Sequence, residues 1–160
     1  MAIASYSDLR MALVRALNRP DLNASIPDYI AMAEGGFNRR LRLNPMETEA
    51  TGTLTKDQNS IGSLPSGYLA HLRLSITQGS NQLVLKYATP RDIAQYQGYS
   101  GTPAVFTSVG GQLRVYPAPD SAYPYTLWYY SKITPLSDSA TTNWLLTAYP
   151  DVYYYAALSE

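Results

Sequence analysis

The 160-residue chain contains no cysteine and a single histidine, His71. Without cysteine there is no disulfide and no thiolate metal site. A metal site built from carboxylates alone is also not indicated, because the Asp and Glu residues are scattered without the spacing of metal ligands. The composition therefore predicts neither a metal nor a cofactor, and the absence of cysteine fits a reducing cytoplasm.

Long apolar runs are absent as well. No segment approaches the roughly 20 consecutive apolar residues that cross a bilayer. The N-terminal segment MAIASYSDLR has neither the basic start nor the apolar run of a signal peptide. We therefore expect no membrane partner.

Residues in patterns typical of catalysis are few. His71 lies alone in a strand-like run, where a packed or exposed histidine is commoner than a catalytic one. Glu47 and Glu49 are two residues apart and could share a strand face like the carboxylate pair of a glycosidase, but a solvated strand face explains them as well. Neither GGFNRR nor VGGQLR matches a phosphate-binding loop. The sequence predicts no enzyme.

The formal net charge is zero, yet the charges are unevenly distributed. Arg39, Arg40 and Arg42 lie in a segment without acids, whereas residues 134–160 contain acids and no Lys or Arg. Such asymmetry can steer identical copies into head-to-tail contact. We expect the three arginines to form ion pairs with a neighbouring subunit. Contact with nucleic acid, a solvated charge pattern and a favourable interaction with a helix C-terminus are the alternatives.

Tyrosine is abundant, with 15 residues against two Phe and two Trp. Because tyrosine combines a large apolar ring with a polar tip, it suits subunit interfaces. Aromatic residues also form sugar-binding platforms, so a carbohydrate-binding or other tail-associated module is the alternative. Tyr149, Tyr153, Tyr154 and Tyr155 lie on a predicted helix, however, and a flat sugar platform is typical of sheets or loops.

Two helices are predicted at the N-terminus. The first starts at Ser5 or Ser7 and ends at Asn18 and Pro20. The second starts near Ser25 and ends at Asn44-Pro45, so that the three arginines fall in its last turns. The expected buried positions of the first are Leu9, Leu13, Ala16 and Leu17, and those of the second are Ile26, Ile30, Ala33, Phe37 and Leu41.

The middle of the chain is predicted to form antiparallel strands. Short alternating runs begin near residue 48, and the clearest of them flank Gly110-Gly111, a typical two-residue hairpin turn. That turn pairs Ser108 with Leu113 and Phe106 with Val115, which places three apolar side chains on one face. A loop then leads to a final helix within residues 143–160.

Segregated helices and strands predict an α+β fold. We expect one domain over 1–160, with a helical part at 5–44 and 143–160 and a β-rich insertion at 48–133. The C-terminal helix should pack back on the helical part.

Several segments of the sequence resemble the head-to-tail adaptor, or connector, proteins of tailed bacteriophages. The matching segments are LNRPDL at 17–22, AE at 33–34, NRRLR at 38–42, GGQLRVYPAP at 110–119, and the run from YYSKITPLSD at 129–138 into NWLLTAYPDVYYYAALSE. The last run is the most specific of these, and together the segments span most of the chain.

The resemblance implies a structural protein of the virion neck, made in the host cytoplasm. It implies a dodecameric ring of copies that binds under the portal protein, extends the DNA channel and docks a tail or nozzle protein. Genomic double-stranded DNA would pass through this channel without specific binding. In one respect the sequence departs from the family: it stops inside what is expected to be a continuing helix, so that either the remainder was truncated or the helix ends against a partner.

The C-terminal helix is expected to have two faces with different contacts. We expect Tyr149, Val152, Tyr153 and Ala156 to face the protein's own helices. Tyr154, Tyr155 and Leu158 should then form an exposed apolar patch that contacts a neighbouring subunit or the portal.

Overall fold

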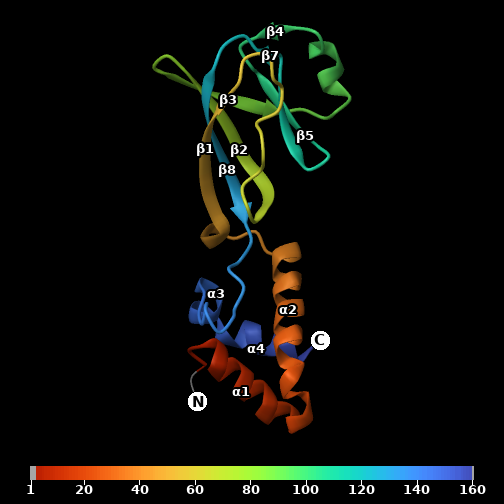
Figure 1. Ribbon diagram of the computed structural model, residues 1–160, viewed down its shortest axis with the longest axis vertical. Coiled ribbons are helices and arrows are strands. Elements are labelled where there is room, and N and C mark those ends of the chain that lie inside the picture. The colour runs from red at the N-terminus through yellow and green to blue at the C-terminus, as the bar shows by residue number, and fades with distance from the viewer. Residues whose placement is uncertain (1–2, 160) are drawn as a thin grey trace. The chain divides into compact units, whose positions relative to one another are not determined.

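The computed structural model describes residues 3–159 and has helices at both ends of the chain and a mostly antiparallel sheet between them (Figure 1). This arrangement confirms the α+β class. The chain divides into two compact units. The helical unit comprises Met1–Met46 and Lys132–Glu160, and the sheet unit comprises Glu47–Ser131. That both units belong to one domain stays a prediction.

Helix α1 (Tyr6–Leu17) begins and ends where the sequence predicts. The Ser5 hydroxyl oxygen accepts a hydrogen bond from the Asp8 N–H at 3.2 Å and donates to Asp8 Oδ2 at 2.8 Å, so Ser5 caps the helix. Asn18 closes the helix in the left-handed region, at φ 49°. Leu9 and Leu13 are buried as expected, whereas Ala16 is exposed and Leu17 is half-buried.

Helix α2 (Ile26–Arg40) follows a short 3₁₀ segment, η1 (Pro20–Ala24). Its buried positions are Ile26, Ile30, Ala33, Glu34 and Phe37. The helix ends earlier than predicted, since Leu41 is extended at φ −86° and ψ 140°. The prediction that Arg42 lies in the last turn is therefore wrong. Arg42 lies beyond the helix and turns back to donate to the main-chain oxygens of Asn38 and Leu41.

The C-terminal segment forms two helices, α3 (Trp144–Ala148) and α4 (Pro150–Leu158), instead of one. The break falls at Tyr149, which precedes a proline and has a non-helical ψ of 66°. The ring of a following proline disfavours the helical conformation, which explains the break. Helix α4 packs against α1, α2 and α3 within the helical unit (Figure 1).

The main sheet of the sheet unit has six strands in the order β1-β8-β2-β3-β5-β6. These are β1 (Glu47–Leu54), β2 (Tyr68–Gln78), β3 (Asn81–Tyr87), β5 (Val105–Val109), β6 (Gln112–Tyr116) and β8 (Tyr123–Ser131). A second, small sheet joins β4 (Ser100–Gly101) to β7 (Ala118–Pro119).

The prediction of a purely antiparallel middle is wrong at two places. Strands β3 and β5 pair in parallel, and so do β4 and β7. Parallel neighbours need a crossover, and residues 88–104, which include the 3₁₀ helix η3 (Asp92–Tyr96), provide it between β3 and β5. The remaining pairs of neighbours in the main sheet are antiparallel.

The β5–β6 hairpin confirms the predicted register. Ser108 is opposite Leu113 and Phe106 is opposite Val115, with Gly110 and Gly111 at φ 60° and 73° in the turn. Phe106, Leu113 and Val115 enter one buried core. The other fully buried members of this core are Leu54, Leu74, Ile76 and Leu127.

A glycine on β1 is covered by an aromatic ring. Gly52 is directly opposite Tyr125 on β8, and a Cβ at Gly52 would lie 2.6–2.8 Å from atoms of the Tyr125 ring and hydroxyl. The Tyr125 hydroxyl reaches past Gly52 and donates to the Ile61 carbonyl at 3.2 Å. The absence of a side chain at residue 52 therefore makes room for this hydrogen bond.

Candidate interaction surfaces

A buried polar network fixes α4 on α2. The Tyr153 hydroxyl donates to Glu34 Oε1 at 3.1 Å, and Asn143 Nδ2 donates to the Tyr153 oxygen at 2.7 Å. Asn143 also caps α3, because its Oδ1 accepts from the Leu146 N–H at 2.9 Å. Tyr153 is fully buried and packs its ring edge-on against Phe37, with the ring centroids 5.1 Å apart. Every polar member of this cluster has a partner, which favours one fixed position for α4.

The same helix α2 holds the segment that follows β8. Asn38 Oδ1 accepts from the Ile133 N–H at 2.9 Å, and Glu34 Oε1 accepts from the Leu136 N–H at 2.8 Å. Glu34 and Asn38 are four residues apart and therefore lie on one face of the helix. Burial raises the pKa of the Glu34 carboxyl, and the hydrogen bonds from Leu136 and Tyr153 lower it in part.

The sequence patterns did not identify Glu34, Asn38 or Asn143 as residues of this network. A signal for Glu34 was present, because it lies within the apolar stripe formed by Ile30, Ala33 and Phe37. A carboxylate at such a position needs buried donors, which helix periodicity alone does not identify.

The predicted faces of α4 are partly wrong. Tyr153 is buried as expected, but Tyr149 and Val152 are 54% and 38% exposed. The buried face consists of Tyr153 and Ala157 instead. Tyr149 precedes α4 as its N-cap residue and has a non-helical conformation, at φ −141° and ψ 66°, so helical spacing does not apply to it.

The proposed contact residues of α4 differ in exposure. Tyr155 is 68% exposed, whereas Tyr154 and Leu158 are half-buried. The Tyr154 and Tyr155 rings meet edge to face with their centroids 5.3 Å apart. Tyr154 also borders a depression of about 440 Å³ with Ile3, Ala12, Arg15 and Ala16. The half-buried Tyr154 therefore borders a mostly apolar hollow on the helical unit, and the exposed Tyr155 contacts the Tyr154 ring.

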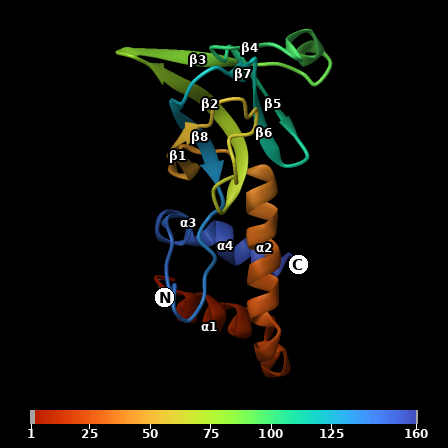
Figure 2. The same cartoon turned by 45° about the horizontal axis from the view of Figure 1, so that its top comes forward.

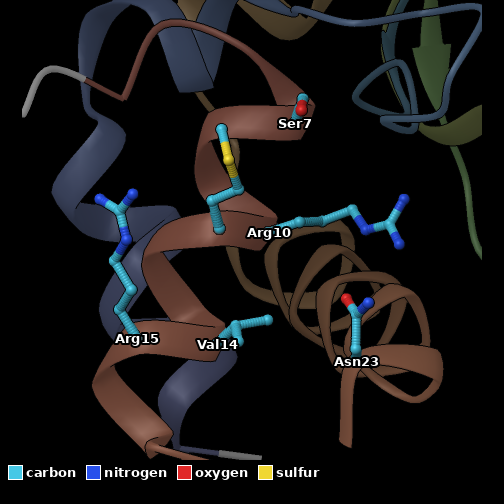
Figure 3. A pocket seen from close by; sticks show the side chains of 6 residues that line it. Ser7, Arg10, Val14, Arg15 and Asn23 are labelled. Carbon is cyan, nitrogen blue, oxygen red and sulfur yellow. The ribbon is translucent and has the colours of Figure 1, made fainter. Parts of the chain in front are cut away.

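A second depression of about 440 Å³ lies along the other flank of α1 (Figure 3). Arg10 and Arg15 leave the helix on different sides, and Asn23 comes from η1. The Arg10 guanidinium lies 5.6 Å from the centre of the Tyr6 ring and 3.8 Å from Asp138. Met11 in this depression is 43% exposed. This flank of α1 thus presents apolar surface bordered by cations.

The arginines of the NRRLR segment fall into two groups. Arg39 and Arg40 are exposed, and neither forms an ion pair with any residue in the range 3–159. The Arg39 guanidinium folds back over Gly35, where a Cβ would lie 3.3 Å from it. Arg42 has a structural role, because it binds the carbonyls at the end of α2. Arg39 and Arg40 are therefore the two with charges available to a partner.

The remaining polar candidates are His71, Glu47 and Glu49, all in the sheet unit. The His71 ring stacks on Tyr87 with centroids 4.9 Å apart, and burial lowers its pKa. Glu47 and Glu49 are exposed on β1. Between residues 3 and 159 no group of three or more His, Asp or Glu side chains is placed to bind a metal ion. In the same range, no helix is both long and apolar enough to traverse a bilayer.

These features define an α+β protein with exposed tyrosine and arginine side chains on its helical unit, where buried hydrogen bonds hold α4. A family model, described as SU10 adaptor protein, matches residues 4–160. The chain therefore belongs to the SU10 adaptor protein family and is a structural adaptor protein of a bacteriophage, a component of the virion neck. No curated protein matches the sequence.

Proposed function

We propose that copies of this chain assemble into a dodecameric ring under the portal protein, extend the DNA channel and dock a tail or nozzle protein. The observation that carries this proposal is the pair Tyr154 and Tyr155: Tyr155 is 68% exposed and its ring contacts that of Tyr154, which borders a hollow on the helical unit. Exposed aromatic side chains next to apolar depressions are typical of protein interfaces.

The buried network explains how this surface is held. Tyr153 ties α4 to Glu34 on α2 and to Asn143 before α3, so the next two residues start from a fixed backbone. Because a tyrosine has few rotatable bonds, its immobilisation at an interface costs little conformational entropy. A preorganised pair of tyrosines suits a contact that must form repeatedly around a ring.

The charge of the chain suits passage of DNA. Its formal net charge is zero, so a channel lined by many copies would not hold the phosphate backbone through general electrostatic attraction. Genomic DNA is therefore proposed as a molecule that moves past the ring and not as a bound ligand. Arg39 and Arg40 are proposed to pair with acids on a neighbouring subunit or on the portal.

The direct test is co-purification with the portal protein encoded in the same phage genome. Tagged wild-type chain should retain the portal at physiological salt, and a Tyr155→Ser variant should not. Circular dichroism and thermal unfolding of the variant establish that it is folded. Failure of the wild-type chain to retain the portal at any salt concentration would contradict the proposal.

Binding of a glycan is the second candidate, and one depression on the sheet unit favours it. Tyr96, Tyr99 and Tyr116 border a hollow of about 360 Å³ together with the amides of Asn59 and Gln97. Tyr99 is 68% exposed. Aromatic rings and amides without charge suit a neutral sugar. A glycan screen beside the portal co-purification separates the two, since glycan binding without portal binding would support this candidate.

A further inference from the structure

One face of helix α2 is turned away from the core of the helical unit. Helix α2, drawn in orange, stands along one side of this unit (Figure 2). Its outer face is formed by Asp28, Ala31, Met32, Gly35 and Arg39, which line a hollow of about 490 Å³. These residues recur three or four positions apart and therefore follow one side of the helix. The buried positions of α2 lie on the opposite side.

The outer face of α2 is apolar at its centre and carries opposite charges at its ends. Met32 is 51% exposed at the centre. Asp28 and Arg39 are exposed at the two ends, and neither has an ion-pair partner anywhere in the described chain, residues 3–159. The two charges lie about three helical turns apart, which is about 16 Å along the axis. An antiparallel copy of the same face would therefore bring each charge to its opposite.

We infer that the outer face of α2 binds the same face of a second copy of this chain, with the two helices antiparallel. Asp28 of each copy then pairs with Arg39 of the other. Met32 is four residues inward from Asp28, and Gly35 is four residues inward from Arg39. The Met32 side chain of each copy therefore lies level with Gly35 of the other, where the lack of a side chain leaves room for it.

Gly35 supports a close partner on this face. Glycine is unfavourable inside a helix, and the fold of a single copy does not require it at residue 35. Of the described atoms, a Cβ there would meet only Arg39 Nη1, at 3.3 Å, which is the end of a flexible side chain. When the Arg39 guanidinium extends to Asp28 of the second copy, it uncovers Gly35 for Met32 of that copy. The same movement thus forms the ion pair and opens the apolar contact.

This two-fold contact differs from the contacts of the proposed ring and does not depend on them. A two-fold contact uses the same surface on both copies and is complete with two, whereas neighbours in a ring meet through two different surfaces. The inferred dimer is therefore a form of the unassembled chain. Because Arg39 is also proposed to pair within the ring, the dimer dissociates before a copy enters it. A single helix face is a small interface, so the dimer should be weak.

Oxidation of a single introduced cysteine tests the geometry, because the chain has no cysteine of its own. Residue 32 lies within one helical turn of the two-fold axis, so Met32→Cys should form a disulfide-linked dimer at high protein concentration on non-reducing gels. Met11→Cys is the matched control, since Met11 is 43% exposed on α1. The dimer yield of Met32→Cys should exceed that of Met11→Cys several-fold. Equal yields would overturn the inference, because random collision would then explain them.

Exchange of the two charges tests the pairing. Sedimentation velocity of the wild-type chain over a concentration series should show a monomer–dimer equilibrium. Asp28→Arg and Arg39→Asp should each weaken the dimer about tenfold or more, because each places like charges together. The double variant restores opposite charges and should recover the dimer.

Circular dichroism establishes that the three variants are folded. A wild-type chain that is monomeric at every concentration would overturn the inference, and so would a double variant as weak as the single ones. Large assemblies of the wild-type chain without a dimer would also overturn it and would leave the proposed ring standing.

Discussion

The hydroxyl of Tyr153 donates a hydrogen bond to Glu34 Oε1 at 3.1 Å, across 119 positions of the sequence. The same oxygen accepts the Leu136 N–H at 2.8 Å. One carboxylate on α2 thus holds both α4 and the segment that follows β8. Tyr154, which follows Tyr153 in the sequence, is half-buried, and Tyr155 is exposed. The buried contact of Tyr153 therefore supports the proposed docking surface that these two residues form.

Replacement of Glu34 should separate the role of the acceptor from that of the charge. Glu34→Ala removes the acceptor of two buried donors, and we expect it to lower the free energy of unfolding by about 2–4 kcal/mol. Glu34→Gln retains an Oε1 acceptor without the charge, and we expect a value within about 1 kcal/mol of wild type at pH 7. Urea unfolding of both variants measures this difference. An equal loss in both would show that the negative charge is required.

The pH dependence of stability should also change in Glu34→Gln. Burial raises the pKa of the Glu34 carboxyl in the folded protein above its value in the unfolded chain. At a pH between these two values, the folded protein therefore binds a proton at Glu34 more tightly than the unfolded chain does. The stability from this group is complete below its ordinary pKa and is lost as pH rises through the folded pKa. Wild type should therefore lose stability relative to Glu34→Gln as the pH rises from about 4.5. If the free energies of unfolding of wild type and Glu34→Gln changed in parallel with pH, Glu34 would not have the raised pKa inferred from its burial.

The sequence predicted best those features that depend on neighbouring residues. The turn at Gly110-Gly111 set the hairpin register, and Ser5 with Asp8 set the start of α1. Predictions that depended on distant contacts failed. The parallel pairing of β3 with β5 follows from a 17-residue crossover at 88–104, and nothing local in either strand encodes it.

The candidate surface was predicted only in part for the same reason. Helical spacing identified Tyr153 as buried and Tyr155 as outward-facing. It did not show that Pro150 would remove Tyr149 from the helix, nor that Ala157 would complete the buried face. The partners of Glu34 are 102 and 119 residues away, so the pairing that fixes α4 could not be read from local patterns.

Gly52→Ala should disrupt the contact between β1 and the Tyr125 ring. A Cβ at residue 52 would lie 2.6 Å from the Tyr125 hydroxyl oxygen, so the ring must move and its hydrogen bond to the Ile61 carbonyl should break. We expect a loss of about 1–3 kcal/mol in the free energy of unfolding. Gly36→Ala is the matched control. Its Cβ meets nothing within 4 Å in α2, and it should stabilise by up to about 1 kcal/mol.

Charge reversal at Arg39 and Arg40 should impair assembly more than folding. Both side chains are exposed and form no ion pair within residues 3–159, so the double variant to Glu should change the melting temperature by no more than about 3 °C. Capture of the portal or of further copies should fall sharply. Arg42→Gln is the comparison, since it removes bonds to the Asn38 and Leu41 carbonyls and should lower the melting temperature instead. Normal assembly by the double variant would show that Arg39 and Arg40 are solvated and do not pair with a partner.

Substitution of the tyrosines at the end of the chain tests the docking surface most directly. Tyr155→Ser removes a ring that is 68% exposed and contacts only the Tyr154 ring among the aromatic residues described, so the free energy of unfolding should fall by no more than about 1.5 kcal/mol while portal capture is lost. Tyr154→Ser and Leu158→Ser remove half-buried side chains, and we expect each to reduce both stability and capture.

Tyr149→Ser is the control, because Tyr149 is 54% exposed but lies outside α4. Equal loss of capture in Tyr149→Ser and Tyr155→Ser would show that the contact extends beyond the face of α4. Unchanged capture in Tyr155→Ser would exclude this face as the site of docking, because no other exposed ring lies on it among the residues that the structure describes.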